Sequence, residues 1–141
     1  MKWYTVGIMS GLISGVVLGL FLKLIQIVTH IKVYTLLLNV DFMPIIGHIV
    51  WPELIEFVFH LLIACIIGLS YGALLIKRSN RYTLAILLTL PTIPLYVPLT
   101  LLSIKETPAL YDLYAILWWV AGHILFALAL ALSHQILVRR V

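Results

Sequence analysis

Residues 52–76 read PELIEFVFHLLIACIIGLSYGALLI, and Glu53 and Glu56 are the only charged residues in this run. An α-helix needs about 20 mainly apolar residues to cross the hydrocarbon core of a bilayer. The run meets that length, and the basic residues Lys77, Arg78 and Arg81 follow it, as is typical of the end of a span. The sequence therefore predicts a membrane-spanning helix over residues 52–76.

Three further segments have the same character, namely residues 4–28, 82–104 and 112–138. The whole chain is 64% hydrophobic and 10% charged, whereas soluble domains carry about 25% charged residues. This composition excludes a soluble globular domain. We predict an all-α integral membrane protein with a single domain over residues 1–141 and four transmembrane helices in an up-down bundle.

The connection over residues 29–51 is the longest of the three and is semi-apolar, with Asn39, Asp41, Pro44 and Gly47 as turn signals. A loop of this composition is not expected to lie free in water. We predict that it lies in the membrane interface or folds back onto the protein.

Basic residues predict the orientation, because lysine and arginine accumulate on the cytoplasmic side of membrane proteins. If both termini share a side, that side carries Lys2, Lys77, Arg78, Arg81, Arg139 and Arg140, and the other carries Lys23, Lys32 and Lys105. We therefore expect cytoplasmic N- and C-termini, in a bacterial cytoplasmic membrane. The net charge of +4 is explained by this placement, so we expect the lipid bilayer and no nucleic acid as a partner.

All acidic residues fall on the outer side in this orientation: Asp41, Glu53, Glu56, Glu106 and Asp112. Any polar site is therefore expected in the outer half of the bundle. Glu53 and Asp112 have a simple structural explanation, since acids are favourable at helix N-termini.

The first span carries glycines at a strict spacing of four, which places them on one helix face: Gly7, Gly11, Gly15 and Gly19. Such a face predicts close helix packing in a membrane. The partner is either another helix of the bundle or the same helix of a second subunit.

Lys23 continues this spacing, and Glu56 and His60 share a face of the second span with Glu53. A face with ionisable groups is expected to point into the bundle, because a charge facing hydrocarbon is costly. We predict a Lys23–Glu56 ion pair between antiparallel first and second spans. The pair could serve chemistry or only determine helix register, and Lys23 could instead extend toward the interface.

The third span contains Pro91, Pro94 and Pro98. Each proline frees a backbone carbonyl that needs another partner inside a membrane, and Thr89 and Thr92 are candidates. The pattern indicates either a kinked helix that shapes the bundle or a broken helix that lines a polar cavity or acts as a hinge.

His60 in the second span and His123 in the fourth are expected at similar depths, where they could converge. With Glu56 they could bind zinc or another divalent ion, or the two imidazoles could ligate a haem. Alternatively they are hydrogen-bonded buried histidines that titrate together with Glu56. No motif selects a metal, a cofactor or a catalytic residue.

Three functions remain open from the sequence. The first is a transport or permeation protein whose polar site is formed by Lys23, Glu56, His60 and His123, as a homo-oligomer joined along the glycine face. The second is a non-catalytic subunit bound to another membrane protein. The third is a membrane-embedded enzyme that uses Glu56 or His60 as a base or metal ligand.

Overall fold

The computed structural model describes residues 2–77 and 80–139 and contains only helices, turns and loops over that range. Four helical stretches in it are long and apolar enough to cross a membrane: α1 (Trp3–Thr29), α3 (Glu53–Leu75), the stretch Arg81–Leu101 and α6 (Leu113–Arg139). The predicted all-α class is thereby confirmed over the described residues, as are four helices with the length and apolar content that a span requires. Arg78 and Arg140, used for the predicted orientation, lie outside the described residues.

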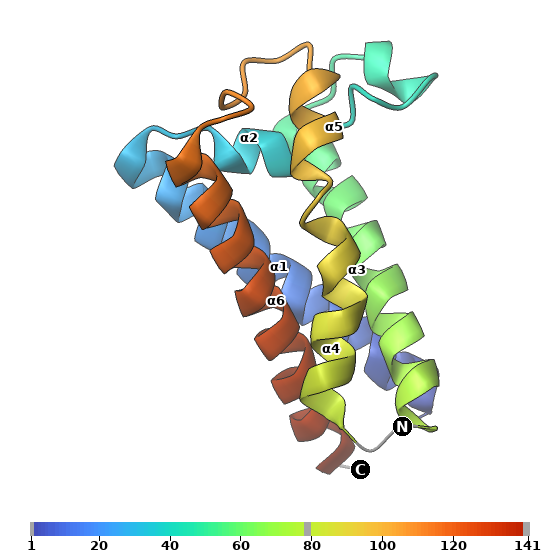
Figure 1. Cartoon of the computed structure of the whole chain (residues 1–141). Helices are drawn as coiled ribbons and strands as arrows, with labels where there is room; N and C mark the ends of the chain where they lie inside the picture. Colours follow the sequence, from blue (N-terminus) through green and yellow to red (C-terminus); the bar gives the residue numbers. More distant parts are fainter. Residues whose placement is uncertain (1, 78–79, 140–141) are drawn as a thin grey trace.

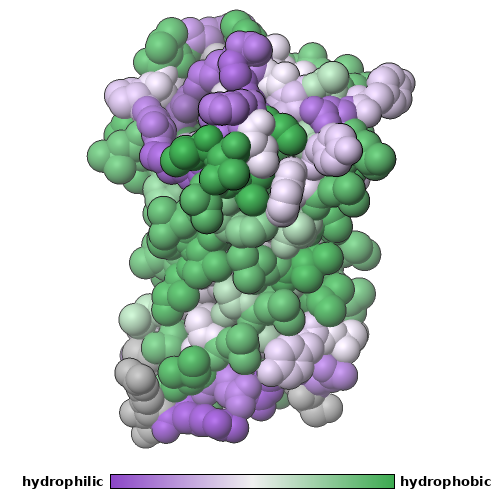
Figure 2. All heavy atoms as spheres, turned by 90° about the vertical axis from the view of Figure 1, so that its left-hand side faces the viewer, coloured by the Kyte–Doolittle hydropathy of each residue, from purple (hydrophilic) through white to green (hydrophobic). Residues whose placement is uncertain are grey.

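The surface of the molecule matches a bilayer in its polarity. Figure 2 shows a broad hydrophobic band across the middle of one face, with hydrophilic residues gathered at both ends. Large apolar side chains such as Leu20, Leu24 and Ile27 are more than half exposed on α1. Exposed apolar area on this scale is unusual for a monomer in water and is expected where lipid is the solvent.

Helix α1 is the centre of the arrangement, since it packs along both α3 and α6, while the third stretch packs mainly on α6. Both termini lie at one end of the molecule (Figure 1). The other end, here called the capped end, is formed by α2 (Val33–Leu37), η1 (Ile46–His48) and the connection over residues 102–112. Asn39 Nδ2 joins the segment after α2 to α5 (Tyr96–Leu101) by donating to Leu99 O at 2.8 Å.

The glycine face of α1 packs against α3 of the same chain. A Cβ atom added to Gly11 would lie 2.3 Å from Ala64 O, and one added to Gly7 would lie 2.7 Å from Gly68 O. The same face continues through Gly15 and Gly19 onto α3 side chains. Of the two predicted partners for this face, the structure shows the first, another helix of the same chain; a homo-oligomer stays a prediction.

The glycine contacts also determine the antiparallel register of α1 and α3. Gly11 lies opposite Ala64, and two turns further along Gly19 lies opposite Phe57. Each step of four residues along α1 is matched by about four residues backward along α3. Extending this register by one more turn places Lys23 opposite Glu53.

The third stretch is broken rather than merely bent: α4 (Arg81–Thr89) is followed by η2 (Leu90–Thr92) and α5 (Tyr96–Leu101). The break leaves carbonyls without their usual helical donors. Thr92 Oγ1 donates to Thr89 O at 2.6 Å, and Trp119 Nε1 donates to Ile93 O at 3.2 Å. Thr92 thus has the predicted role, whereas Thr89 donates to Ala85 O within α4.

The long first connection folds back onto the helices, as one of the two predicted placements requires. Val33 and Leu36 of α2 are fully buried. Gln26 fastens the start of this segment to α1, because its side-chain Oε1 accepts from Thr35 N at 2.9 Å. The later part of the connection is exposed, with Ile45 and Val50 at 81% and 92% accessibility.

Candidate functional site at the capped end

A cavity of about 540 Å³ lies between α3, α5 and α6, beneath the segment that follows α2. Its volume falls within the range of about 300–1,000 Å³ that is usual for small-molecule sites. Most of its lining is apolar, for example Leu18, Ile63, Leu99 and Phe126. The break in the third stretch contributes directly to the wall, through Thr92.

The cavity reaches the apolar surface of the molecule. Leu62, Ile63 and Ile66 of α3 line it and are 54%, 57% and 59% exposed, and Leu95 lines its other side at 47% exposure. Its mouth is therefore bordered by apolar side chains of α3 and of the segment before α5. This surface lies along the spans, where a bilayer would place lipid tails.

Three of the four residues proposed for the polar site line this one cavity, namely Glu56, His60 and His123. His60 Nε2 lies 3.0 Å from Gly15 O, because Gly15 leaves room for the ring to approach the α1 backbone. His123 Nδ1 lies 2.8 Å from Trp119 O, one turn earlier in α6. The two imidazoles are thus held by backbone carbonyls on facing helices.

Lys23, the fourth proposed residue, is not part of this lining. It forms an ion pair with Glu53, at 2.5 Å between Nζ and Oε1, so the predicted Lys23–Glu56 pair is wrong. The reason is the α1–α3 register: Gly19 lies opposite Phe57, so Lys23, one turn further along α1, lies past Glu56 and opposite Glu53. Both partners are largely exposed, with 43% and 58% of their side chains accessible.

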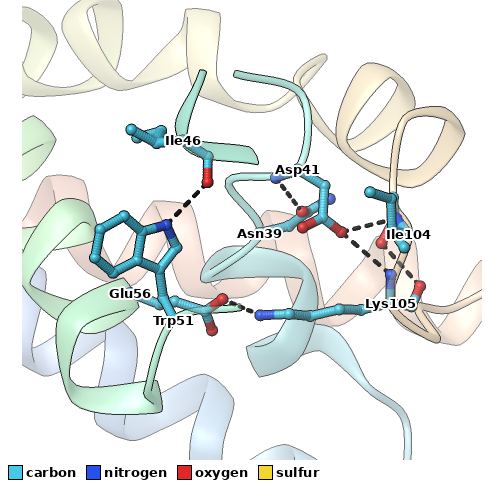
Figure 3. A network of polar contacts seen from close by, with 8 residues as sticks. Asn39, Asp41, Ile46, Trp51, Glu56, Ile104 and Lys105 are labelled. Atoms are coloured by element: carbon cyan, nitrogen blue, oxygen red, sulfur yellow. Dashed lines mark hydrogen bonds and ion pairs between the residues drawn. The ribbon is translucent and has the colours of Figure 1, made fainter. Parts of the chain in front are cut away.

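Glu56 is instead paired with Lys105, which comes from the connection before α6 (Figure 3). The Glu56 side chain is only 8% exposed, whereas that of Lys105 is 32% exposed. Sequence reasoning missed Lys105 because it lies in a loop outside the spans. The sequence did contain one indication of this pair. The predicted outer side carries three lysines and five acids, so Lys105 could be expected to have an acidic partner.

The remaining charges of the capped end are also paired. Lys32 pairs with Glu106 across two connections. Tyr34 donates to Glu53 Oε1 at 3.1 Å, and burial together with the neighbouring Glu53 carboxylate raises the pKa of Tyr34 to about 12. Asp112 accepts from Ala115 N at 3.1 Å, which confirms its predicted role at the start of α6.

Asp41 fastens the first connection to the loop that carries Lys105. Its Oδ2 accepts from Ile104 N at 2.7 Å and from Lys105 N at 3.1 Å, while its own backbone amide donates to Asn39 Oδ1 (Figure 3). The Asp41 carboxylate thereby holds the backbone of Lys105 in position. Trp51 closes the same segment by donating to Ile46 O at 2.9 Å.

Replacing Asp41 with alanine is expected to free both loop amides and to destabilise the capped end by about 2 kcal/mol, since hydrogen bonds to a charged group contribute about 1.5–3 kcal/mol. Hydrogen exchange at Ile104 and Lys105 should become faster. The Asp41→Asn variant keeps an acceptor oxygen and is the matched control, with a smaller effect. Equal exchange in the wild type and the Asp41→Ala variant would contradict this account.

A metal site is not supported by the side-chain geometry. Among the described residues, no three histidine, cysteine, aspartate or glutamate side chains come close enough together to hold an ion. Glu56 already bonds Lys105, and both imidazoles bond backbone carbonyls. The predicted combination of His60, His123 and Glu56 therefore shares a cavity without forming a ligand set.

No protein-family model, curated protein or solved structure matches this chain.

Proposed function

We propose that the chain is a membrane transport protein that binds its substrate in the cavity between α3, α5 and α6. The observation that carries the proposal is the cavity itself, which combines a mouth on the apolar surface with buried Glu56 and His123. A non-catalytic subunit that only contributes to the assembly of a membrane complex does not require an internal cavity. Interior polar groups beside a membrane cavity are typical of substrate pathways.

The proposal includes an orientation. The end with both termini carries Lys2, Lys77, Arg81 and Arg139 of the described basic residues, so we place it in the cytoplasm of a bacterial cell. The capped end then faces outward, and the cavity belongs to the outer half of the bilayer. A substrate would enter from the outer leaflet, between α3 and the segment before α5.

The broken third stretch supports movement. Broken helices in transporters supply both the binding site and the moving part. Here Thr92, Leu95 and Leu99 line the cavity at or just after the break. Rotation of α5 about residues 90–95 would open or close the wall opposite α3 while α1, α3 and α6 stay packed.

The test uses access to the cavity, which does not require a known substrate. In a Cys65→Ala background, a Thr92→Cys variant is expected to react with a membrane-impermeant thiol reagent applied to either side of oriented vesicles. Filling the mouth by Ile63→Trp should slow this reaction several-fold, because Ile63 lines the cavity. Val58→Trp is the matched control, since Val58 is 43% exposed on the same helix and does not line the cavity.

Reaction from one side only would overturn the transport proposal and leave a static binding site. Equal slowing by both tryptophan variants would show that the reagent reaches residue 92 by a route other than the cavity.

A further inference from the structure

Each of the two histidines that line the cavity leaves one ring nitrogen free as a hydrogen-bond acceptor. Backbone carbonyls only accept, so His60 must donate through Nε2 to Gly15 O, and His123 must donate through Nδ1 to Trp119 O. Neither imidazole has an acidic partner among the described residues, and an unpaired buried charge is costly, which favours neutral rings. A neutral ring that donates through one nitrogen presents the other as an acceptor. His60 Nδ1 and His123 Nε2 are therefore free acceptors.

These acceptors have no hydrogen-bond partner among the described residues. Among polar side-chain atoms sealed inside the described part of the chain, only Thr100 Oγ1 lacks a hydrogen-bond partner. The free nitrogens of His60 and His123 are not among these sealed atoms. Both residues line the cavity, although His123 is only 4% exposed. Glu56, at 6% exposure, adds a carboxylate whose second oxygen accepts no bond from the described residues.

This set of groups selects among ligand classes. An anion would find few free donors, since Lys105 is paired with Glu56, and Asn39 and Thr92, which also line the cavity, already donate to Leu99 O and Thr89 O. A bare cation would have to displace Lys105 or accept an incomplete ligand shell, since no three ligating side chains gather among the described residues. A neutral head with a hydrogen to donate satisfies the imidazoles without adding a charge to an apolar space.

The rest of the cavity suits an alkyl chain. From Glu56 to Ile67 the α3 wall is about 16 Å long at 1.5 Å per residue, and both residues line the cavity. Ile67 and Phe126 make the end remote from Glu56 apolar. Moving an alkyl chain from the bilayer into the cavity contributes little binding free energy, because lipid is as apolar as the cavity wall. Selection must therefore come from the head, whose hydrogen bonds form in a low-dielectric interior.

We infer that the cavity binds a single-chain lipid alcohol, whose hydroxyl donates to the free nitrogen of His60 or His123 while its chain lies along α3 toward Ile67 and Phe126. This inference names the substrate class of the proposed transport function and so rests on that function. The hydroxyl is bound at the depth of the histidines, and Lys105 closes the cavity above it through Glu56. The ligand enters through the mouth bordered by Leu62, Ile63 and Leu95.

The experiment compares three photoactivatable probes with one chain and different heads, using the full chain in lipid nanodiscs. The alcohol can donate, its methyl ether can only accept, and the corresponding carboxylate is an anion. One hydrogen bond contributes about 0.5–1.5 kcal/mol, so labelling of peptides that contain Ile67 or Phe126 should be up to about tenfold stronger with the alcohol than with the ether. His60→Phe and His123→Phe should each reduce this preference, and Val58→Trp should leave it unchanged.

Equal labelling by alcohol and ether in the wild type would overturn the inference, and so would stronger labelling by the carboxylate. This wild-type comparison does not depend on whether a histidine variant folds. If the alcohol is preferred but a cysteine at position 92 reacts from one side only, the ligand assignment stands and transport fails. If that cysteine reacts from both sides without preference for the alcohol, transport stands and the ligand assignment fails.

Discussion

The Lys105→Met variant is expected to lose about 3 kcal/mol of unfolding free energy, since removing one partner of a buried ion pair costs about 3–5 kcal/mol. Glu56 would then be left without its cation at 8% side-chain exposure. The lower end of the range applies because Lys105 itself is 32% exposed. Reversible unfolding in mixed micelles measures the effect.

Two further variants separate the buried charge from general damage to the loop. Glu56→Gln leaves Lys105 able to turn toward water and should cost less than Lys105→Met. The double variant should recover most of the loss, because a buried pair replaced as a unit is often neutral. Lys32→Met is the matched control, since Lys32 and Glu106 are 40% and 81% exposed and an exposed pair contributes about 0–1 kcal/mol. A Lys105→Met loss no larger than that of Lys32→Met would contradict a buried Glu56 charge.

The Gly11→Ala variant is the second large effect, with an expected loss of about 3 kcal/mol, the upper part of the usual cost of overpacking. The added Cβ would lie 2.3 Å from Ala64 O and 3.0 Å from Cys65 Cα. Both atoms belong to the α3 backbone, so α1 and α3 must separate. The same measurement of unfolding free energy applies, and the separation should also weaken the contact of His60 with Gly15 O.

Gly19→Ala is the control for this variant, because its Cβ would meet Phe57 Cε2 at the same 2.3 Å. The obstacle there is a side chain that can rotate, and alanine gains about 1 kcal/mol over glycine in helix propensity. A net change near zero is expected. If Gly11→Ala were as mild as Gly19→Ala, backbone contact would not be what holds α1 against α3.

Much of the helical framework could be predicted because it depends on local composition. A run such as residues 52–76 has few alternatives to a spanning helix once its length and apolar content are known. The glycine spacing in α1 likewise predicted a close contact, since it determines what a helix face presents. It could not predict which helix would use that face.

The ion pairs could not be predicted from local sequence alone. The Lys23–Glu56 prediction assumed a depth for each residue, but pairing depends on register, and register followed from the contact of Gly11 with Ala64 and Gly19 with Phe57. An error of one helical turn was enough to exchange Glu53 for Glu56. The actual partner of Glu56 is 49 positions away in sequence, and the contacts of Asp41 bring it there.

Local composition was enough to predict a helical chain, four stretches long and apolar enough to cross a membrane, and acids gathered toward one end. Those properties depend on the composition of short segments, so they can be predicted without knowing how the helices pack. Which side chains meet depends instead on packing: Glu56, His60 and His123 line one cavity, Lys23 is not part of its lining, and Lys105 pairs with Glu56. A cavity exists only where helices distant in sequence fail to fill the space between them, and that depends on the register and the break rather than on any single segment.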